Sequence, residues 1–401
     1  MPDTGVATSG RAPATPPTWP FPIDDPYPAY ARARAGFPAG VGWSDELGAW
    51  LVLSHAGVNE VLRSEAWSAD PQRSPELMAR MAPGLAESSF LSRMLLFSDP
   101  PEHDRLRAAV NRFFTPRRVE AIRGRVASIV NAAFSGAGTP VDSGVDVNVI
   151  EEIAYPVPLA VICELFDVGT DTALLLREET PVMAAMLDLL APPSLQSEAA
   201  GAAMSAMMAL VPIVAERRKS PGEDLLSVLA ERLEPDEAVI MALLLLAAGH
   251  ETTSALIGNA VMAAAATGSI PADVDGFVEE VLRWDSPVQV TGRIAAADHA
   301  LFGCPVRAGD QAVLVLGAAN RDPEVFDDPD RFDPSRFAPG RPRTAHLAFG
   351  HGAHFCVGAA LARIEAAEVV RRLASLDWEL GEHERAASST FRRMRNLKIR
   401  A

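Results

Sequence analysis

Residues 349–358 read Phe349-Gly350-His351-Gly352-Ala353-His354-Phe355-Cys356-Val357-Gly358, and an Ala-rich stretch with helical spacing follows. One cysteine is thus predicted just before a helix, where free backbone N–H groups and the positive end of the dipole favour the thiolate. The thiolate is the form of cysteine that ligates metals. Glycines in the loop allow a tight turn and a close approach of a flat group to the sulfur. A lone cysteine is more often a small core residue, but that reading leaves the glycines, aromatic residues and histidine unexplained.

Composition narrows the classes of function. The chain has 401 residues, 48% of them hydrophobic, and a formal net charge of −16. Such an acidic chain is a poor candidate for binding nucleic acid or an anionic membrane. Its three cysteines, Cys163, Cys304 and Cys356, lie far apart, so we expect no disulfide framework and a reducing, cytoplasmic location.

The pattern along the chain predicts a mainly α fold with a minor β portion. Residues 1–18 are expected to be a disordered leader, and residues 19–401 a single domain, because neither repeats nor contrasting linkers interrupt them. Helices are predicted from His103 to Gly136, broken at Thr115-Pro116, and from Val147 to Ala266, with strands between Ser286 and Val315. The longest apolar run, Val239–Ala248, is about half a bilayer span. We therefore expect a soluble chain with no membrane anchor.

A second motif, Ala247-Ala248-Gly249-His250-Glu251-Thr252-Thr253, interrupts an apolar helix with polar residues. Buried polar groups need partners, and a threonine hydroxyl can bond the carbonyl one turn back and bend the helix. By itself the segment also fits a partly buried helix whose polar stripe meets solvent.

Together these motifs resemble the cytochrome P450 family, whose haem-ligand loop reads F-G-x-G-x-H-x-C-x-G and whose oxygen-binding helix reads [AG]-G-x-[DE]-T-T. The resemblance implies the cytochrome P450 fold and a haem b whose iron is ligated by the Cys356 thiolate. It implies that Ala248 and Gly249 leave room for O₂, that Thr252 hydrogen-bonds the oxygen, and that Glu251 belongs to a proton-delivery chain. Further loop residues at the cofactor would be Phe349, Gly350 and Gly358.

Glu280-Val281-Leu282-Arg283 taken alone is an ordinary i,i+3 ion pair on a helix surface. It resembles the family's internal salt-bridge motif, which a later arginine completes, here Arg336 in Pro334-Ser335-Arg336-Phe337. The resemblance implies a structural role for Glu280, Arg283 and Arg336 in holding the loop that carries Cys356.

Haem has two propionates, and their burial requires charge-assisted donors such as Arg and His. Any single base is more often a solvated surface residue. The resemblance assigns the propionates to four bases at matching motif positions: His103, Arg107, Arg293 and His354.

The family resemblance implies a monooxygenase that needs two electrons per turnover. The chain has no flavin or nicotinamide fingerprint, so ferredoxin and ferredoxin reductase are the expected donors. Arg112, Arg117 and Arg118 form a candidate docking patch, although scattered solvated arginines would look the same. We expect a monomer. Two alternatives are an oxidase that couples or desaturates without inserting oxygen, and a non-enzymatic haem sensor, against which the Glu251-Thr252 pair argues.

The substrate is expected to be an apolar, natural-product-type small molecule, because the segments that line the pocket in this family are rich in Leu, Met, Ala and Val here. The predicted lining residues are Leu85, Phe90, Leu91, Met94, Leu95, Met183, Met186, Leu187, Leu244, Ala248, Val288, Gln289, Val290 and Phe391. The tail departs from the family pattern, since Arg392-Arg393-Met394-Arg395-Asn396 is unusually basic and lacks a glycine.

Overall fold

Helices make up most of the structure, which is a computed structural model that describes residues 20–80, 93–136, 144–188, 191–341 and 345–401. The predicted leader, residues 1–18, lies outside these ranges. Within them the helices are α1 (Tyr27–Gly36), α2 (His55–Arg63), α3 (Pro75–Arg80), α4 (Glu102–Asn111), α5 (Pro116–Ala121), α6 (Arg123–Ser135), α7 (Pro156–Phe166), α8 (Thr170–Met183), α9 (Pro193–Lys219), α10 (Leu225–Arg232), α11 (Pro235–Thr267), α12 (Val274–Trp284), α13 (Leu316–Ala319) and α14 (Ala359–Leu373).

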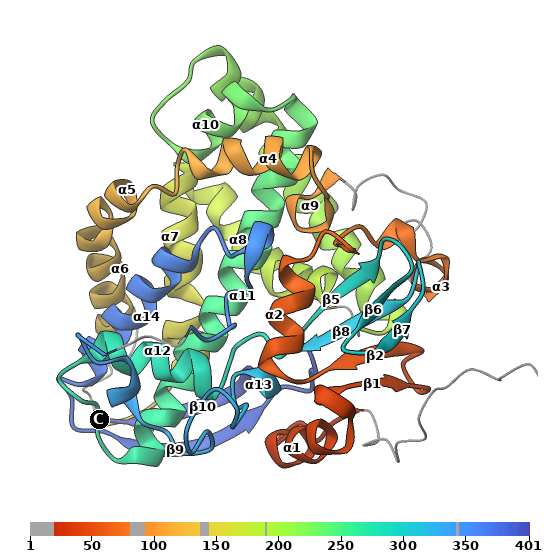
Figure 1. Ribbon diagram of the computed structural model, residues 1–401. Coiled ribbons are helices and arrows are strands. Elements are labelled where there is room, and N and C mark those ends of the chain that lie inside the picture. The colour runs from red at the N-terminus through yellow and green to blue at the C-terminus, as the bar shows by residue number, and fades with distance from the viewer. Residues whose placement is uncertain (1–19, 81–92, 137–143, 189–190, 342–344) are drawn as a thin grey trace, which may run out of the picture.

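The strands form a smaller part beside the helices. They are β1 (Val41–Ser44), β2 (Ala49–Val52), β3 (Trp67–Ser68), β4 (Asp146–Asn148), β5 (Val290–Ala295), β6 (His299–Leu301), β7 (Cys304–Val306), β8 (Gln311–Val315), β9 (Glu379–Arg385) and β10 (Met394–Arg400). The main sheet has the order β1-β2-β8-β5-β3, in which only β2 and β8 run parallel. Figure 1 shows this sheet on the right of the molecule and the helices α5, α6 and α7 on the left. The predicted mainly α fold with a minor β portion is confirmed.

One boundary differs from the prediction. Val147 was expected to begin a helical region but lies in β4, which pairs with the C-terminal strand β10. Val147 and Ile399 are register partners, and a π-helical turn over Ile150–Ala154 follows. A strand this short has too little local pattern to be recognised, because its pairing partner is about 250 residues away in sequence.

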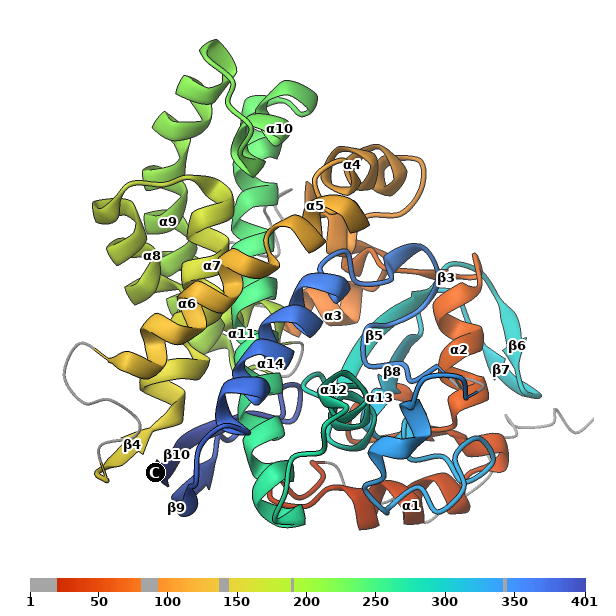
Figure 2. The same cartoon turned by 90° about the vertical axis from the view of Figure 1, so that its left-hand side faces the viewer.

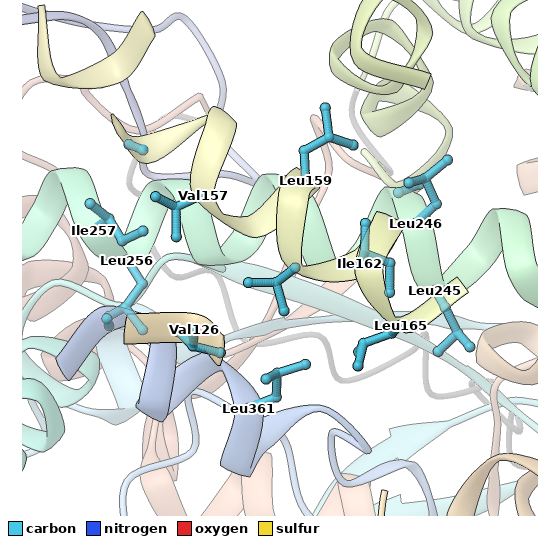
Figure 3. Packing of buried hydrophobic residues seen from close by; sticks show 14 of the residues in the cluster. Val126, Val157, Leu159, Ile162, Leu165, Leu245, Leu246, Leu256, Ile257 and Leu361 are labelled. Atoms are coloured by element: carbon cyan, nitrogen blue, oxygen red, sulfur yellow. The ribbon is translucent and has the colours of Figure 1, made fainter. Parts of the chain in front are cut away.

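The long helix α11 runs through the middle of the helical layer, as the turned view in Figure 2 shows. A capping box between Glu234 and Glu237 and a proline at the first position start the helix, and Gly268 with a positive φ ends it. Apolar side chains of α6, α7, α11 and α14 interleave around it, among them Val126, Leu159, Leu256 and Leu361 (Figure 3).

Among the described residues, two helices are long and apolar enough to cross a membrane, Pro235–Thr267 and Ser194–Lys219. The apolar window of α11 is 83% buried inside the protein, so its hydrophobicity is that of a core helix. The corresponding window of α9 is only 33% buried.

Candidate active site

Two glycine conformations and a backbone hydrogen bond fix the shape of the cysteine loop. Gly350 and Gly352 have φ of +70° and +71°, and a Cβ at Gly352 would lie 2.5 Å from the carbonyl oxygen of Leu62. The Cys356 N–H donates to the Phe349 carbonyl at 2.9 Å, which closes the loop just before α14 begins. The glycines at 350 and 352 are therefore required by conformation, and at 352 also by close approach to α2.

Burial raises the pKa of the Cys356 thiol, while the Gly358 N–H, Arg107 and Arg363 lower it. The local donors thus act as the sequence predicts, but desolvation outweighs them.

Four bases from three distant segments meet beside this loop, and we call them the basic quartet: His103, Arg107, Arg293 and His354. The rings of His103 and His354 lie 4.2 Å apart between centroids. Burial, followed by the charges of Arg293, His103 and Arg107, lowers the pKa of His354 to about 3. Burial also lowers the pKa of Arg293 to about 10.

Among the described residues, the acids nearest the basic quartet are Asp104 and Asp99; the charge of Asp99 raises the pKa of Arg293, but Asp99 forms its ion pair with Arg73. His103 contacts the exposed carboxylate of Asp104 through Nδ1 at 3.2 Å, but its buried Nε2 has no partner. Arg293 is 7% exposed, and its Nη1 donates only to the Gly292 carbonyl. Within the described residues neither Arg107 nor Arg293 forms an ion pair, and buried guanidinium groups without a contacting counter-charge are costly, so this arrangement suits an anionic ligand.

A cavity of about 260 Å³ separates the cysteine loop from α11. Cys356 lies in one wall, and Ala248, Gly249 and Thr252 lie in the other. The Thr252 hydroxyl donates to the Ala248 carbonyl at 2.7 Å, which is the one-turn-back bond that the sequence suggested.

A second cavity, of about 390 Å³, adjoins the first. Six residues line both cavities, which therefore meet above α11: Leu96, Ala248, Thr252, Val288, Thr291 and Arg293. The walls of the larger cavity are mostly apolar. The two cavities together can therefore hold a flat group beside Cys356 and an apolar molecule over that group.

Comparisons with known proteins give the class of this fold. The chain is 39% identical over 367 residues to a cytochrome P450 monooxygenase, PikC, of Streptomyces venezuelae, which covers 87% of this chain and 83% of that protein. The chain belongs to the cytochrome P450 family. The family model for cytochrome P450 matches residues 274–384.

Other cytochrome P450s show the same likeness. The chain is 34% identical to 6-deoxyerythronolide B hydroxylase of Saccharopolyspora erythraea, over 87% of this chain and 88% of that protein. The solved structure of P450BioI with a ligated acyl carrier protein superposes with a TM-score of 0.84 at 28% identity, over 94% of this chain and 99% of that one. Ligand-free CYP164A2 of Mycobacterium smegmatis gives 0.81 at 35% identity, over 94% and 97% of the two chains.

The P450 family has a haem with cysteine thiolate ligation. The residues present fit that group. The cavity offers a sulfur on one side, small residues Ala248 and Gly249 on the other, and Arg293 and His354 in its lining, with the partnerless Nε2 of His103 beside His354.

The predicted structural residues meet in a buried cluster beneath the cysteine loop. Arg283 donates to both oxygens of Glu280, at 2.8 and 2.7 Å, and both side chains are fully buried. Arg336 lies 3.5 Å from Glu280. Arg283 also donates to the carbonyls of Asn320, Pro329 and Arg331.

Asn320 connects this cluster to the cysteine loop through hydrogen bonds. Its side chain accepts the Leu347 N–H at 2.6 Å, and the Leu347 carbonyl accepts the Gly350 N–H at 2.9 Å. A continuous set of hydrogen bonds therefore joins Arg283 to the first glycine of the loop.

A second ion cluster next to the first was missed by the sequence reasoning. Glu279 accepts from Arg363 at 3.1 Å and lies 3.2 Å from His346, and Arg363 stacks over Phe349 at 4.4 Å. Burial opposes ionisation of Glu279, but hydrogen bonds from His346 and Arg363 outweigh it and lower its pKa to about 2. The only available signal was that Glu279 immediately precedes Glu280.

Glu251 is buried beside Thr252, yet it lines neither of the two cavities. Its Oε1 lies 2.6 Å from Nη1 of Arg393, whose side chain is 28% exposed. Arg393 Nη1 also donates to the Tyr155 hydroxyl at 3.1 Å. Burial raises the pKa of Glu251, while Arg393 lowers it and Asp188 raises it further.

Two arginines of the basic tail pair with buried carboxylates. Arg393 pairs with Glu251, and Arg392 pairs with the buried Asp285 while donating to the carbonyls of Ile23 and Asp24. No sequence signal linked these residues, because the partners are more than 100 positions apart.

The predicted pocket residues divide into three groups. Five line the larger cavity: Leu187, Ala248, Val288, Val290 and Phe391; of these, Ala248 and Val288 also line the smaller one. Leu85, Phe90 and Leu91 lie outside the described residues. The rest line neither cavity in the structure: Met94, Leu95, Met183, Met186, Leu244 and Gln289.

The misplaced residues have physical explanations. Met94, Leu95, Met183 and Leu244 are buried in the core, and a 3-10 turn over Leu95–Phe97 turns Leu96 and Phe97 to the cavity instead. Gln289 donates to the Ser286 carbonyl at 2.7 Å rather than facing the pocket.

Proposed function

We propose that this chain is a haem-thiolate monooxygenase that oxidises an apolar, natural-product-type molecule with O₂ and two electrons. The observation that supports this best is the position of Cys356 opposite Thr252 across one cavity, with a larger apolar cavity opening above Thr252. Two named relatives act as a monooxygenase and as a hydroxylase of 6-deoxyerythronolide B, which is consistent with this substrate class.

Cys356 would ligate the haem iron, and the basic quartet would bind the propionates through charge-assisted hydrogen bonds. When bound, the haem supplies O₂ activation, which thiolate ligation promotes. The loop around the sulfur includes Phe349, Gly350 and Gly358. On the opposite wall, the small residues Ala248 and Gly249 leave space in the cavity. Thr252 holds a hydroxyl in that wall, where it can accept or pass on a proton, and the apolar walls exclude bulk water.

Glu251 would bring protons towards Thr252 from the surface. Its partner Arg393 spans from the buried carboxylate to solvent, since 28% of the Arg393 side chain is exposed while Glu251 is fully buried. A carboxylate paired with a partly exposed cation can exchange protons with water when the cation moves away. Movement of Arg393 would thus control the delivery of protons to Thr252.

Electrons would come from a ferredoxin and its reductase. Arg112, Arg117 and Arg118 line a surface groove together with Arg232 of α10, and α5 packs against α14, the helix after the cysteine loop. A local basic groove on a chain of net charge −16 would steer an acidic protein to this face. A cytoplasmic monomer fits such diffusing partners.

The test is the absorption spectrum of the reduced, carbon monoxide-bound protein. We expect the Soret band of thiolate ligation, and its loss in Cys356→Ser but not in the matched variants Cys163→Ser and Cys304→Ser. A thiolate spectrum retained in Cys356→Ser would refute the assignment of the ligand. Product analysis under labelled O₂ then distinguishes oxygen insertion from coupling or desaturation, and absence of any oxidised product across apolar substrates would favour a sensor.

A further inference from the structure

The ion pair between Glu279 and Arg363 lies beside the cysteine loop and has no role in the mechanism above. Glu279 is on α12, which packs against α14. Its carboxylate accepts hydrogen bonds from Nε and Nη2 of Arg363, the second at 3.1 Å. Nη1 of Arg363 donates to the carbonyl of Ala359, the first residue of α14, at 3.2 Å. The pair therefore joins α12 to the first turn of the helix that follows the cysteine.

The guanidinium of Arg363 also faces the cysteine loop directly. Its Cζ lies 4.4 Å from the centroid of the Phe349 ring, a distance at which a cation is attracted to an aromatic face. The carbonyl of Phe349 accepts the Cys356 N–H at 2.9 Å. One residue of the loop thus contacts the guanidinium through its ring and the cysteine through its backbone. A carboxylate, a carbonyl and a ring together fix the position of this cation.

Of the two members of the pair, the cation is the one that acts on the sulfur. Burial raises the pKa of the Cys356 thiol, and the Gly358 N–H, Arg107 and Arg363 oppose that rise, whereas Glu279 is not among the groups that shift it. Arg107 belongs to the basic quartet, whose charge the propionates would balance. Arg363 is therefore the cation left to act on the thiolate when the cofactor is bound.

The charge near the sulfur matters for reduction of the cofactor. A ferric iron that takes up one electron without a proton gains one unit of negative charge. A fixed cation nearby stabilises the reduced form more than the oxidised form, and a fixed anion does the opposite. Groups that surround the ligand of a metal, without touching the metal, tune its reduction potential in this way.

We propose that Arg363 raises the reduction potential of the cysteine-ligated haem iron, and that Glu279 is a positioning residue that holds this cation and partly balances its charge. The inference rests on the proposed haem-thiolate function. In the step concerned, a reduced iron–sulfur protein gives one electron to the ferric iron, which becomes ferrous while the donor is oxidised. No bond forms or breaks, and no proton is transferred. Arg363 favours this electron transfer, and Glu279 limits the effect.

The experiment is a redox titration of the haem-loaded proteins at neutral pH, followed by the Soret band. Arg363→Gln should lower the potential, because it removes the cation. Glu279→Gln should raise it, because the amide oxygen still accepts from Arg363, and the Ala359 carbonyl and the Phe349 ring still hold the guanidinium. Each shift should be at least about threefold in the equilibrium constant for one electron, roughly 30 mV. The double variant should return towards the parent potential.

Two further variants separate charge from structure. Arg363→Lys keeps the positive charge without the planar guanidinium, and it should restore most of the potential lost in Arg363→Gln. Arg371→Gln is the matched control, because Arg371 lies two turns further along α14, pairs with Asp275 and Glu368, and is 37% exposed against 34% for Arg363. It should leave the potential unchanged.

The signs of the shifts decide the outcome. An unchanged potential in Arg363→Gln, or shifts of the same sign in Arg363→Gln and Glu279→Gln, would overturn the proposal. A weaker KM for ferredoxin at an unchanged potential would make Arg363 a docking residue and would overturn it as well. If Arg363→Gln does not take up haem, the sign of the shift in Glu279→Gln still decides. Absence of the thiolate spectrum in the parent itself would instead refute the proposed function.

Discussion

Replacing Arg393 with Met tests the buried pair that connects the basic tail to α11. The substitution leaves the Glu251 carboxylate without the guanidinium that lies 2.6 Å from it. Removing one partner of a buried ion pair typically costs about 3–5 kcal/mol, and the partial exposure of Arg393 reduces this to roughly 2–3 kcal/mol.

The cost should depend on pH. Burial raises the pKa of Glu251, so between the unfolded value and the folded value the native state binds the proton more tightly, and stability falls as pH rises through that window. Arg393 limits the rise in the pKa of Glu251. Loss of Arg393 therefore extends to higher pH the range over which stability falls. We expect Arg393→Met to cost roughly 2–3 kcal/mol at pH 8 and less at pH 5.5, because the fraction of Glu251 that is protonated rises as pH falls.

The assay is urea unfolding of the haem-loaded proteins at both pH values, followed by tryptophan fluorescence and the Soret band. Arg395→Met is the matched control, because Arg395 lies two residues further along the chain, in β10, and its pair with Glu384 is 73% and 59% exposed. It should change stability little at either pH. The double variant Glu251→Gln, Arg393→Met should regain most of the loss at pH 8. An equal cost at both pH values, or a double variant as unstable as Arg393→Met, would refute this reasoning.

Three further predictions follow from the site. Thr252→Ala should retain haem and substrate binding but lose much of the product formed per electron, with peroxide accounting for the difference, and full coupling would show that the hydroxyl is dispensable; a lost donor in such a site costs about 2.7–4 kcal/mol. Glu279→Gln should lose roughly 3 kcal/mol of stability near pH 7, since its pKa is lowered from 4.5 to about 2, and urea unfolding should show this loss shrinking as pH falls from 5 towards 2. Gly352→Ala should yield little haem-loaded protein by its Soret absorbance, because its Cβ would lie 2.5 Å from the Leu62 carbonyl oxygen; Gly124→Ala, exposed on α6 and with no atom within 4 Å of the added Cβ, is the matched control and should load normally.

Part of this site could be predicted because it is encoded by local motifs. The loop around Cys356, the Glu251-Thr252 pair and the Glu280–Arg283 spacing each lie within ten residues, where backbone geometry alone relates the side chains. The helices before and after Thr115-Pro116 were predicted for the same reason, since Thr115 caps α5 and a proline begins it.

The pocket was predicted less well, because the segments expected to line it were assigned as whole runs. On α11 the smaller cavity is lined by a stripe that includes Leu245, Ala248 and Thr252, and Leu244 lies one position off that stripe. Near the tail, Phe391 lines the larger cavity, while the neighbouring Arg392 turns to Asp285. Which side of a segment faces a cavity depends on its neighbours, and these come from distant parts of the chain.

The sequence by itself determined the family, the mainly α fold and the cysteine expected to hold the cofactor, because short-range patterns of glycine, cysteine and paired charges need only local geometry to be read. Only the tertiary structure decided which charges are paired. It brought the basic quartet together from α4, β5 and the cysteine loop, joined Arg393 to Glu251 across 142 positions, and placed Arg363 between Glu279 and Phe349. It also showed that α11, apolar enough for a membrane span, is a core helix. The physical reason is that burial and the balance of charge depend on what folds against a residue, and a charged side chain has the same identity in a sequence whether it is solvated, paired or isolated.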